Sequence, residues 1–557
     1  MRHPTAYLLT FFCMALAPCS AQNPPGFDDA LARYKECRVR LPFRYQTDGR
    51  DRLAQTRCEV ALALLTDDYG KTKSYPEYAR YTLATLFGRH FDRKEFVDAL
   101  VLARSSNQRP VDTWLWVKTL RIQADRVGDT DVIAIARESK NMLQRAAAIT
   151  AIGDSRGGNL KAVVVPNCVD FPKKESDRML LLGAMSGAFY ENRSRVNDSE
   201  YRDALTVYIG LLGDDVGLSH TAKVQIARHL QWILKGPAMF VNPEPWLELM
   251  KRGDVKAPVV THTVVAPRFF GVETDGERLC YVIDMSDSMC IDIAPSSKPS
   301  TAVVTGPRVK KKRELMDETD LPWEKIKTRW DLAREQLRIS LLRMTPDKYF
   351  SIVWFGTESG TLDSCKGMVK ATKANIDKVV AELDSIKADY KLNPEEQAVS
   401  PDGRLRGKTN LHSGLRRAYG LAGRGFVEQV GYVDSEALTE GCDTIFLLSD
   451  GAPSWDDFNI VDKDYGEGQV VVDTEYNKPA ARSPQLHYHG PYDQDDWLLE
   501  DLKRMNAFRR IRVHCIGLGE ANMGLLGRIA EVGRGEVFVF GAKKDAPKDG
   551  AGGGAKK

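Results

Sequence analysis

Apolar residues recur at three- and four-residue spacing through the first part of the chain, from about residue 27 to residue 251. This spacing predicts amphipathic helices, each with one face that must be buried against a neighbour. The clearest helical patterns cover residues 76–91, 111–128, 140–153, 199–213 and 220–236. Taken in pairs, the helices repeat at roughly 40 residues, which favours a two-helix solenoid, with a non-repetitive helical bundle as the alternative.

The pattern changes after residue 251. Residues 252–268 contain prolines at both ends of an extended run, which predicts a linker. Beyond it, short apolar runs predict strands over 279–284, 349–356, 443–450 and 512–519. Amphipathic segments between and after them predict helices over 330–344, 375–386, 411–422, 496–510 and 523–533. The dipeptide Asp275-Gly276 predicts a tight hairpin before the first of these strands.

Alternating strands and helices indicate a mostly parallel sheet that is covered by helices on both faces. The expected fold class is therefore multidomain, with an all-α, helical-repeat-like region over 27–251 followed by a doubly wound α/β domain over 269–541. Residues 542–557 are rich in Gly and Lys and predict a disordered tail.

Polar side chains follow the predicted strands where each strand ends. The stretch YVIDMSDSM, residues 281–289, delivers Asp284, Ser286 and Ser288 directly after a buried run. Asp450 ends the later run DTIFLLSD, and Thr409 precedes a predicted helix. In open α/β sheets, ligands bind beyond the carboxyl ends of the strands. These side chains are therefore expected at one rim of the sheet.

On these residues, the part of the chain from 269 to 541 resembles the von Willebrand factor type A domain, and the polar clusters resemble its metal-ion-dependent adhesion site. The family pattern is D-x-S-x-S after the first strand, a Thr in a later loop and an Asp after the fourth strand. Asp284, Ser286, Ser288, Thr409 and Asp450 fill these places. The resemblance implies that the two serines ligate a cation directly, that Thr409 is a switchable ligand, and that the aspartates act directly or through water.

The residue types suit a hard divalent cation. Mg²⁺ requires an octahedron of oxygens and dehydrates reluctantly, so hydroxyls, water and one or two carboxylates fit it, and Mg²⁺ is the expected cofactor. Because three ligands are neutral, the cation retains affinity for an external carboxylate. Asp287 stands where the family commonly has Gly between the serines, and it is an additional acidic neighbour whose charge would favour Ca²⁺ or Mn²⁺.

Composition and charge limit the class of partner that the protein can be expected to bind. The chain is 43% hydrophobic and 28% charged, and its net charge is only +3, so nucleic acid is not an expected partner. Residues 1–21 have the basic start, apolar run and small-residue end of a secretory signal peptide. The mature protein is therefore expected to be exported, either periplasmic or secreted, without a transmembrane segment. Lipid attachment at Cys19 is the alternative.

Eight cysteines follow the predicted cleavage point. Cys37 and Cys58 lie on predicted neighbouring helices and are the candidate for a local disulfide. Aligning Asp284 with Asp450 on adjacent parallel strands offsets Cys280 from Cys442 by four residues. That offset is about 13 Å, which is too far for a bond between these two cysteines.

Three extensions, residues 290–324, 392–408 and 453–495, are expected to surround the predicted metal site and to select the partner, because loops on a fixed scaffold usually carry specificity. His487 and His489 lie beside Asp493, Asp495 and Asp496, but no recognisable spacing supplies a third ligand, so a second metal site there is not favoured. Within the helical region, LQRAAAITAIG (143–153) resembles the small-residue helix of a HEAT repeat.

Two function classes remain. The first is a metal-dependent binding or adhesion protein that recognises a protein or other carboxylate-bearing ligand, with the helical region as a second interaction surface. The second is a hydrolase that uses the cation to activate water. His412 is the nearest candidate general base and is expected on a helix surface, and neither G-x-S-x-G nor H-E-x-x-H occurs. The sequence therefore favours a binding protein over an enzyme.

Overall fold

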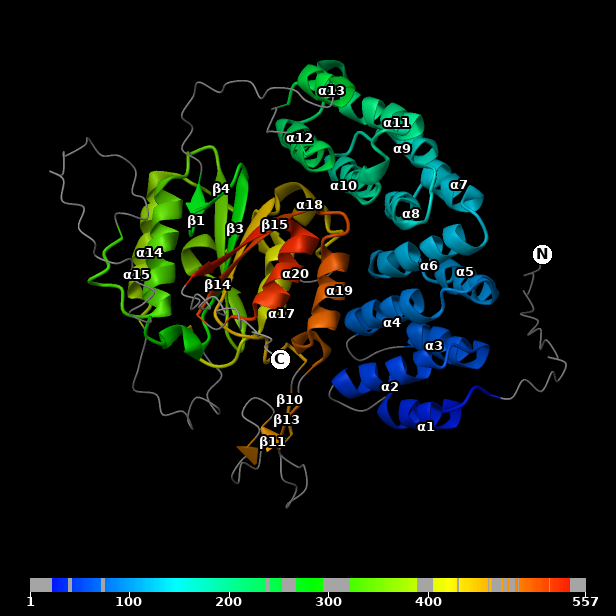
Figure 1. Cartoon of the computed structure of the whole chain (residues 1–557). Coiled ribbons are helices and arrows are strands. Elements are labelled where there is room, and N and C mark those ends of the chain that lie inside the picture. Colours follow the sequence, from blue (N-terminus) through cyan, green and yellow to red (C-terminus); the bar gives the residue numbers. More distant parts are fainter. Residues whose placement is uncertain are drawn as a thin grey trace, which may run out of the picture.

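A computed structural model shows an N-terminal helical region followed by an α/β domain (Figure 1). It describes residues 23–38, 43–71, 76–235, 241–252, 267–293, 321–387, 404–427, 430–458, 460–462, 472–473, 478–479, 486–488, 490–519 and 521–540. The predicted signal peptide and tail lie outside these residues, as do most of the predicted linker, large parts of the three extensions, and the side chains of His487 and His489. In the described helices, none has the length and apolar character needed to cross a bilayer.

The five predicted helical segments of the N-terminal region are helical. Its helices are α1 (Phe27–Cys37), α2 (Phe43–Gln55), α3 (Glu59–Lys71), α4 (Pro76–His90), α5 (Val97–Ser105), α6 (Thr113–Arg126), α7 (Thr130–Glu138), α8 (Met142–Asp154), α9 (Leu160–Val169), α10 (Glu175–Glu191), α11 (Ser199–Gly210), α12 (His220–Leu234) and α13 (Pro243–Arg252). Side-chain caps mark several starts: Asn141 accepts the amide of Leu143 at α8, and Ser219 accepts that of Ala222 at α12.

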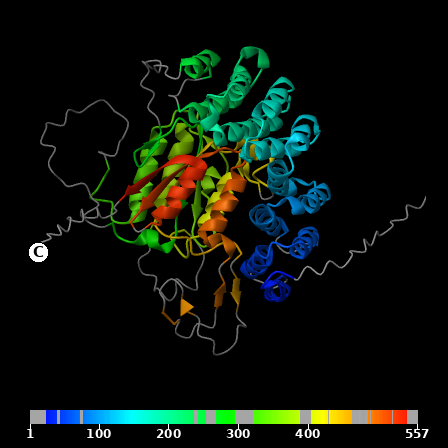
Figure 2. The same cartoon turned by 45° about the vertical axis from the view of Figure 1, so that its right-hand side comes forward.

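The helices of this region lie in two rows. In the first row, α2, α4, α6, α8, α10 and α12 each contact the next, while α7, α9, α11 and α13 follow one another in the second. Figures 1 and 2 show the helices as an arc beside the α/β domain, from blue α1 to green α13. Stacking in rows buries the apolar faces that the sequence pattern predicts, because each helix covers its neighbour.

The α/β domain is built on a seven-stranded sheet with the order β15-β14-β9-β3-β4-β5, in which β6 also pairs with β4. The first five strands of this order are parallel to one another, whereas β5 and β6 are antiparallel to β4. The strands are β3 (Arg278–Asp284), β4 (Tyr349–Phe355), β5 (Ser359–Thr361), β6 (Val369–Lys370), β9 (Thr444–Ser449), β14 (Arg512–Leu518) and β15 (Arg534–Phe540). The four predicted strands are present.

Helices cover both faces of this sheet. They are α14 (Arg329–Leu342), α15 (Lys373–Ser385), α17 (Leu411–Tyr419), α18 (Ser435–Glu440), α19 (Asp495–Met505) and α20 (Met523–Gly533). Along β3, Tyr281 belongs to the same core cluster as residues of α14 and α15, and Val282 belongs to the cluster that contains residues of α17, α19 and α20. Successive strand residues point to opposite faces, so burial on both faces explains the continuous apolar run of β3.

The remaining strands are short pairs outside the main sheet. They are β1 (Arg268–Phe269) with β2 (Val272–Glu273), β7 (Leu421–Ala422) with β8 (Gly425–Phe426), β10 (Ile460–Asp462) with β13 (Leu486–Tyr488), and β11 (Val472–Asp473) with β12 (Lys478–Pro479). The predicted helix 411–422 therefore ends at Tyr419 and gives way to a strand, and the predicted helix 496–510 ends at Met505.

The hairpin predicted at Asp275-Gly276 is wrong. The turn instead lies between β1 and β2, at Phe270 and Gly271, whose φ angles are 50° and 79°. Two successive residues with positive φ form the kind of turn whose twist matches antiparallel strands. The strand that follows Asp275-Gly276 is β3, which pairs in parallel with β4 and β9 and so cannot fold back on β2.

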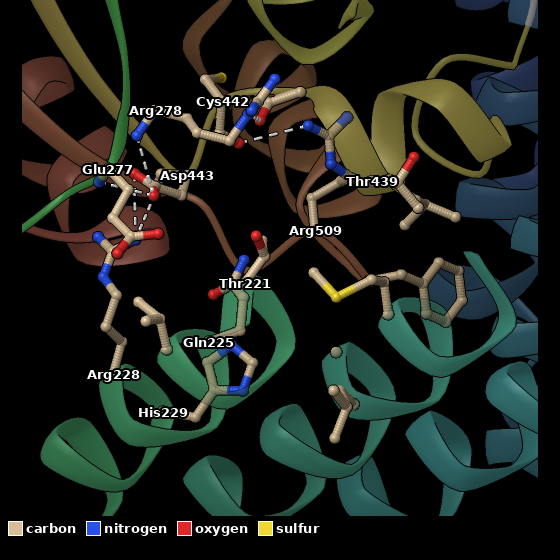
Figure 3. A pocket seen from close by; sticks show the side chains of 17 residues that line it. Thr221, Gln225, Arg228, His229, Glu277, Arg278, Thr439, Cys442, Asp443 and Arg509 are labelled. Atoms are coloured by element: carbon tan, nitrogen blue, oxygen red, sulfur yellow. Dashed lines mark hydrogen bonds and ion pairs between the residues drawn. The ribbon is translucent and has the colours of Figure 1, made fainter. Parts of the chain in front are cut away.

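The first row of helices packs directly on the α/β domain, and residues of both belong to one core cluster. On α12, buried Arg228 contacts Asp443 at 3.1 Å (Nη1 to Oδ1) and donates to the Thr444 hydroxyl at 2.7 Å. Figure 3 shows Arg228 reaching across a small pocket between the two parts. On α4, the Tyr78 ring lies 4.8 Å from the Phe458 ring. Residues 27–251 and 269–541 are thus in extensive contact, and their division into two folding units stays a prediction.

None of the eight described cysteines forms a disulfide. The disulfide expected between Cys37 and Cys58 is not formed, and Cys58 instead contacts the Thr56 hydroxyl at 3.6 Å. The sheet pairs Cys280 with Ile445, so its offset from Cys442 is three residues rather than four. No disulfide joins Cys280 and Cys442, as predicted, although the two thiols are close enough to shift each other's pKa. Their side chains are therefore neighbours, although the strand offset placed them apart.

Candidate metal centre

The candidate site lies where two adjacent parallel strands end. Asp284 is the last residue of β3 and Asp450 directly follows β9, and these strands are paired. Parallel neighbours end at the same edge of a sheet, so both carboxylates lie at that edge. Ser286 and Ser288 follow Asp284 in a turn that ends in a short 3₁₀ helix, Asp287–Cys290. Four of the five predicted ligands therefore come together.

A chain of hydrogen bonds joins these four side chains. The Ser286 hydroxyl donates to Asp284 Oδ1 at 2.6 Å, and the Ser288 hydroxyl donates to Asp450 Oδ1 at 2.7 Å. The two serine hydroxyl oxygens are 3.0 Å apart. Asp284, Ser286 and Asp450 are almost completely buried, whereas Ser288 is half-buried. The arrangement holds two carboxylates and two hydroxyls in one small volume.

The proton positions in this chain bear directly on metal binding. When both carboxylates are ionised they accept the two serine protons, so the 3.0 Å contact between the hydroxyl oxygens has no proton between them. Adjacent ligands of an octahedral Mg²⁺, each at about 2.1 Å from the ion, are about 3.0 Å apart. The spacing of the serine oxygens therefore fits two neighbouring positions of such an octahedron.

Thr409, the fifth predicted ligand, lies beside this chain but outside it. Its loop runs against the serine turn, because Arg406 N donates to Met285 O at 3.1 Å and Asp287 N donates to Gly407 O at 3.2 Å. The Thr409 amide donates to the Ser454 hydroxyl, which fixes its backbone. The Thr409 hydroxyl forms no hydrogen bond with any described residue, and a Cβ on Gly451 would lie 3.7 Å from it. It is thus next to Asp450.

Asp287, the acidic neighbour, begins the 3₁₀ helix and is half-buried. Only two carboxylates take part in the hydrogen-bonded chain. This agrees with a wider observation: in the described part of the protein, no three His, Cys, Asp or Glu side chains gather as a metal-binding group. Any cation at this rim would depend on hydroxyls and water for most of its ligands, as Mg²⁺ does in many sites.

Two residues of the site were not predicted. Ser449 donates its hydroxyl to Asp284 Oδ2 at 2.8 Å, and the Arg329 guanidinium contacts Asp450 Oδ2 at 2.7 Å. Ser449 stands next to Asp450 in the motif LLSDG, so its position was a usable signal. Arg329 is 121 residues away from Asp450 along the chain, and no local pattern connects the two.

The prediction that His412 lies on a helix surface is wrong. It is buried on α17, its Nε2 lies 2.9 Å from Asp501 Oδ2, and its ring stacks on Tyr492 with centroids 4.0 Å apart. The inward face of α17 carries it, because the helix packs between the sheet and the helical region. His412 is therefore committed to a buried network and is not placed as a general base for a cation-bound water.

The site changes the proton affinity of Asp284. Burial, and then the charge of Asp450, raise the pKa of Asp284 to about 7. Without a cation, the folded protein therefore binds a proton here at a pH where the unfolded chain, with a pKa near 3.9, does not. Because the native state binds more protons in this window, its stability is highest below about pH 4 for this group and falls as the pH rises to about 7.

We expect this effect to be visible against Asp284→Asn, which has no titrating group. From about pH 5 to about pH 8, wild type should lose stability relative to the variant by roughly 1–3 kcal/mol. Urea unfolding of both proteins in chelator, at the two pH values, measures the difference, and other titrating groups cancel. A difference between the two proteins that is the same at both pH values would contradict the raised pKa of Asp284.

The pocket in Figure 3 is a weaker candidate for a functional site. It lies between α10, α12 and the start of β3, at the opposite end of that strand from Asp284. Its charged groups are largely used by the protein itself: Asp443 accepts the amides of Glu277 and Arg278, and Arg509 donates to the carbonyl of Cys442. The rim at the carboxyl ends is the better candidate.

Comparison of the chain with models of protein families gives no match, and comparison with curated proteins gives none either. The resemblance stated from the sequence therefore depends on the five motif residues and on the order of the elements that carry them.

Proposed function

We propose that the protein is an exported, metal-dependent binding protein whose α/β part is a von Willebrand factor type A domain with a metal-ion-dependent adhesion site. One observation carries this proposal: the Ser286 and Ser288 oxygens lie 3.0 Å apart, and each is within hydrogen-bond distance of a buried carboxylate. This spacing suits two neighbouring ligands of a divalent cation. The family assignment is supported because each of the five motif positions holds the expected residue type.

Each side chain has a distinct role in this proposal. Ser286 and Ser288 ligate through oxygens that Asp284 and Asp450 orient, and Thr409 adds its hydroxyl when a partner binds. A bound Mg²⁺, or Ca²⁺ or Mn²⁺ in its place, would supply the positive charge that attracts an external carboxylate. The partner is accordingly a protein or another ligand that presents a carboxylate. The net charge of +3 gives no reason to expect nucleic acid.

The helical region would contribute a second interaction surface, and its HEAT-like character is part of the proposal. Its first row of helices packs on the α/β domain, as the contact between Arg228 and Asp443 illustrates. A further partner would therefore bind the second row, α7, α9, α11 and α13, or the ends of the array. Export is supported by the leader-like residues 1–21, with a periplasmic or secreted location and Cys19 as the alternative anchor.

A hydrolase is less well supported. It would need a general base within reach of a cation-bound water, and the nearest candidate by sequence, His412, is paired with Asp501 in a buried network. We therefore propose binding without catalysis.

Metal-dependent stability tests the proposal. At a metal concentration of about 100 times the dissociation constant, the free energy of unfolding should rise by roughly 2.7 kcal/mol. Ser286→Ala deletes one ligand while keeping both carboxylates, so most of this increase should be lost. Urea unfolding with Mg²⁺, Ca²⁺ or Mn²⁺ and with chelator measures it.

Ser385→Ala is the matched control, because Ser385 is an exposed serine at the end of α15 and should leave the metal response unchanged. A wild-type protein that shows no increase with any of the three cations at millimolar concentration would refute the proposed site.

A further inference from the structure

An arginine occupies one side of the candidate metal centre. Arg329 is the first residue of α14, and the helix start is fixed by a capping box in which the Thr328 hydroxyl accepts the Asp331 amide and Asp331 accepts the Thr328 amide. The Arg329 amide itself donates to the carbonyl of Ile291 at 3.0 Å. The backbone of Arg329 is thus held beside the turn that follows the two serines.

The guanidinium of Arg329 lies between Asp450 and Gly519. Its Nη1 is 2.7 Å from Asp450 Oδ2, and the side chain is 14% exposed while that of Asp450 is 0% exposed. On its other side lies Gly519, where φ is 57°, and a Cβ there would be 2.6 Å from Nη2 and 2.8 Å from Cζ. The positive φ favours glycine at 519, and a Cβ there would push the Arg329 guanidinium out of its present position.

Both oxygens of Asp450 are therefore in use. Oδ1 accepts the Ser288 hydroxyl and Oδ2 faces Arg329. A cation that bound Oδ2 would have to displace the guanidinium. A cation that shared Oδ1 would face a positive charge across the same carboxylate, in surroundings where burial reduces screening. In either position, Arg329 opposes the cation.

We propose that Arg329 determines the cation affinity of this site and couples it to an anionic ligand. Arg329 neutralises Asp450 when the cation is absent, and it weakens the binding of a cation alone. The charge of an incoming carboxylate offsets that repulsion, so cation and anion strengthen each other's binding, and by linkage the effect is reciprocal. This inference rests on the proposed function and adds a residue that the five-position motif does not contain.

The test compares wild type with Arg329→Gln and Arg329→Lys as full-length chains. Isothermal titration with Mg²⁺ and with Mn²⁺ measures the dissociation constants, and acetate serves as the anionic probe. Arg329→Gln removes the charge and should bind the cation at least about tenfold more tightly, because one opposing charge close to the ion is gone. Arg329→Lys keeps the charge and should stay within about threefold of wild type. Acetate should improve cation affinity in wild type and have a smaller effect in Arg329→Gln.

Arg338→Gln is the matched control. Arg338 lies on the same helix but pairs with Glu335 and Asp384, so this variant makes the same change in net charge away from the site. It should leave both affinities unchanged. Unfolding in chelator checks that each variant is folded, and Arg329→Met removes the charge in a second way if the glutamine variant does not fold.

The outcomes separate this inference from the proposed function. If wild type binds the cation and Arg329→Gln binds no more tightly, the role of Arg329 is refuted while the metal site stands. If only Arg329→Gln binds a cation, the opposing role of Arg329 is supported and the proposed metal-dependent function of the wild type fails. If no protein binds Mg²⁺ or Mn²⁺, both proposals fail.

Discussion

Replacing Gly183 by alanine is expected to lower the free energy of unfolding by about 2–3 kcal/mol or more. Gly183 lies on α10, where that helix meets the α/β domain. A Cβ at this position would be 1.9 Å from the carbonyl oxygen of Phe508 and 2.7 Å from its carbonyl carbon. Both are backbone atoms, which cannot rotate away as a side chain can, so α10 would have to move off the domain. Urea unfolding of the two proteins measures the loss.

Two other glycines provide graded controls. At Gly187, also on α10, a Cβ would meet the end of the Arg510 side chain, which can move, so Gly187→Ala should cost less. At Gly210, the last residue of α11, a Cβ would meet nothing within 4 Å, and Gly210→Ala should lie within about 1 kcal/mol of wild type. Equal effects at Gly183 and Gly210 would contradict the close packing of α10 on the segment around Phe508.

Asp501→Asn is expected to destabilise the protein by about 3–5 kcal/mol. Asp501 on α19 accepts Arg504 Nε at 2.7 Å and Nη2 at 3.1 Å, and it lies 2.9 Å from His412 Nε2. Burial by itself raises the pKa of Asp501, but the charge of Arg504 and the contact with His412 hold it well below its usual value. Removing this carboxylate leaves the Arg504 charge buried without a counter-ion.

Asp501→Asn also affects the contact between the two parts of the molecule, because the Arg504 guanidinium lies 3.7 Å from the ring centroid of Tyr81 on α4. Glu500→Gln, one residue away on α19, is the control: Glu500 is partly exposed, its partners are Lys503 and Lys118, and its loss should cost less than about 1 kcal/mol. Denaturant unfolding at neutral pH measures both variants. A loss below 1 kcal/mol for Asp501→Asn would show that the buried charges are not interdependent.

Local pattern was a good guide to the main elements and a poor one to edges and turns. The run LCYVID predicted β3 correctly. Both faces of that strand are buried, so its residues are apolar without interruption. By contrast, β15 was not predicted, since this strand lies at the edge of the sheet and leaves Val537 and Val539 partly exposed. The hairpin was misplaced because Phe270 adopts a positive φ, which its residue type does not signal.

The candidate site could also be predicted only in part. Asp284, Ser286 and Ser288 could be predicted together because they follow one strand within five residues, and Asp450 because the adjacent strand ends there. These four residues come together once the two strands that carry them are parallel neighbours in the sheet. The contact of Arg329 with Asp450 could not be predicted.

What the sequence determined by itself was therefore the order of helices and strands and the polar residues at the strand ends, because periodicity and burial act between near neighbours in the chain. The tertiary structure alone decided which distant groups meet. It covered the first row of helices with the α/β domain, buried His412 against Asp501, and seated Arg329 between Gly519 and Asp450. Such contacts depend on packing between segments more than 80 residues apart, for which a single chain carries no local signal.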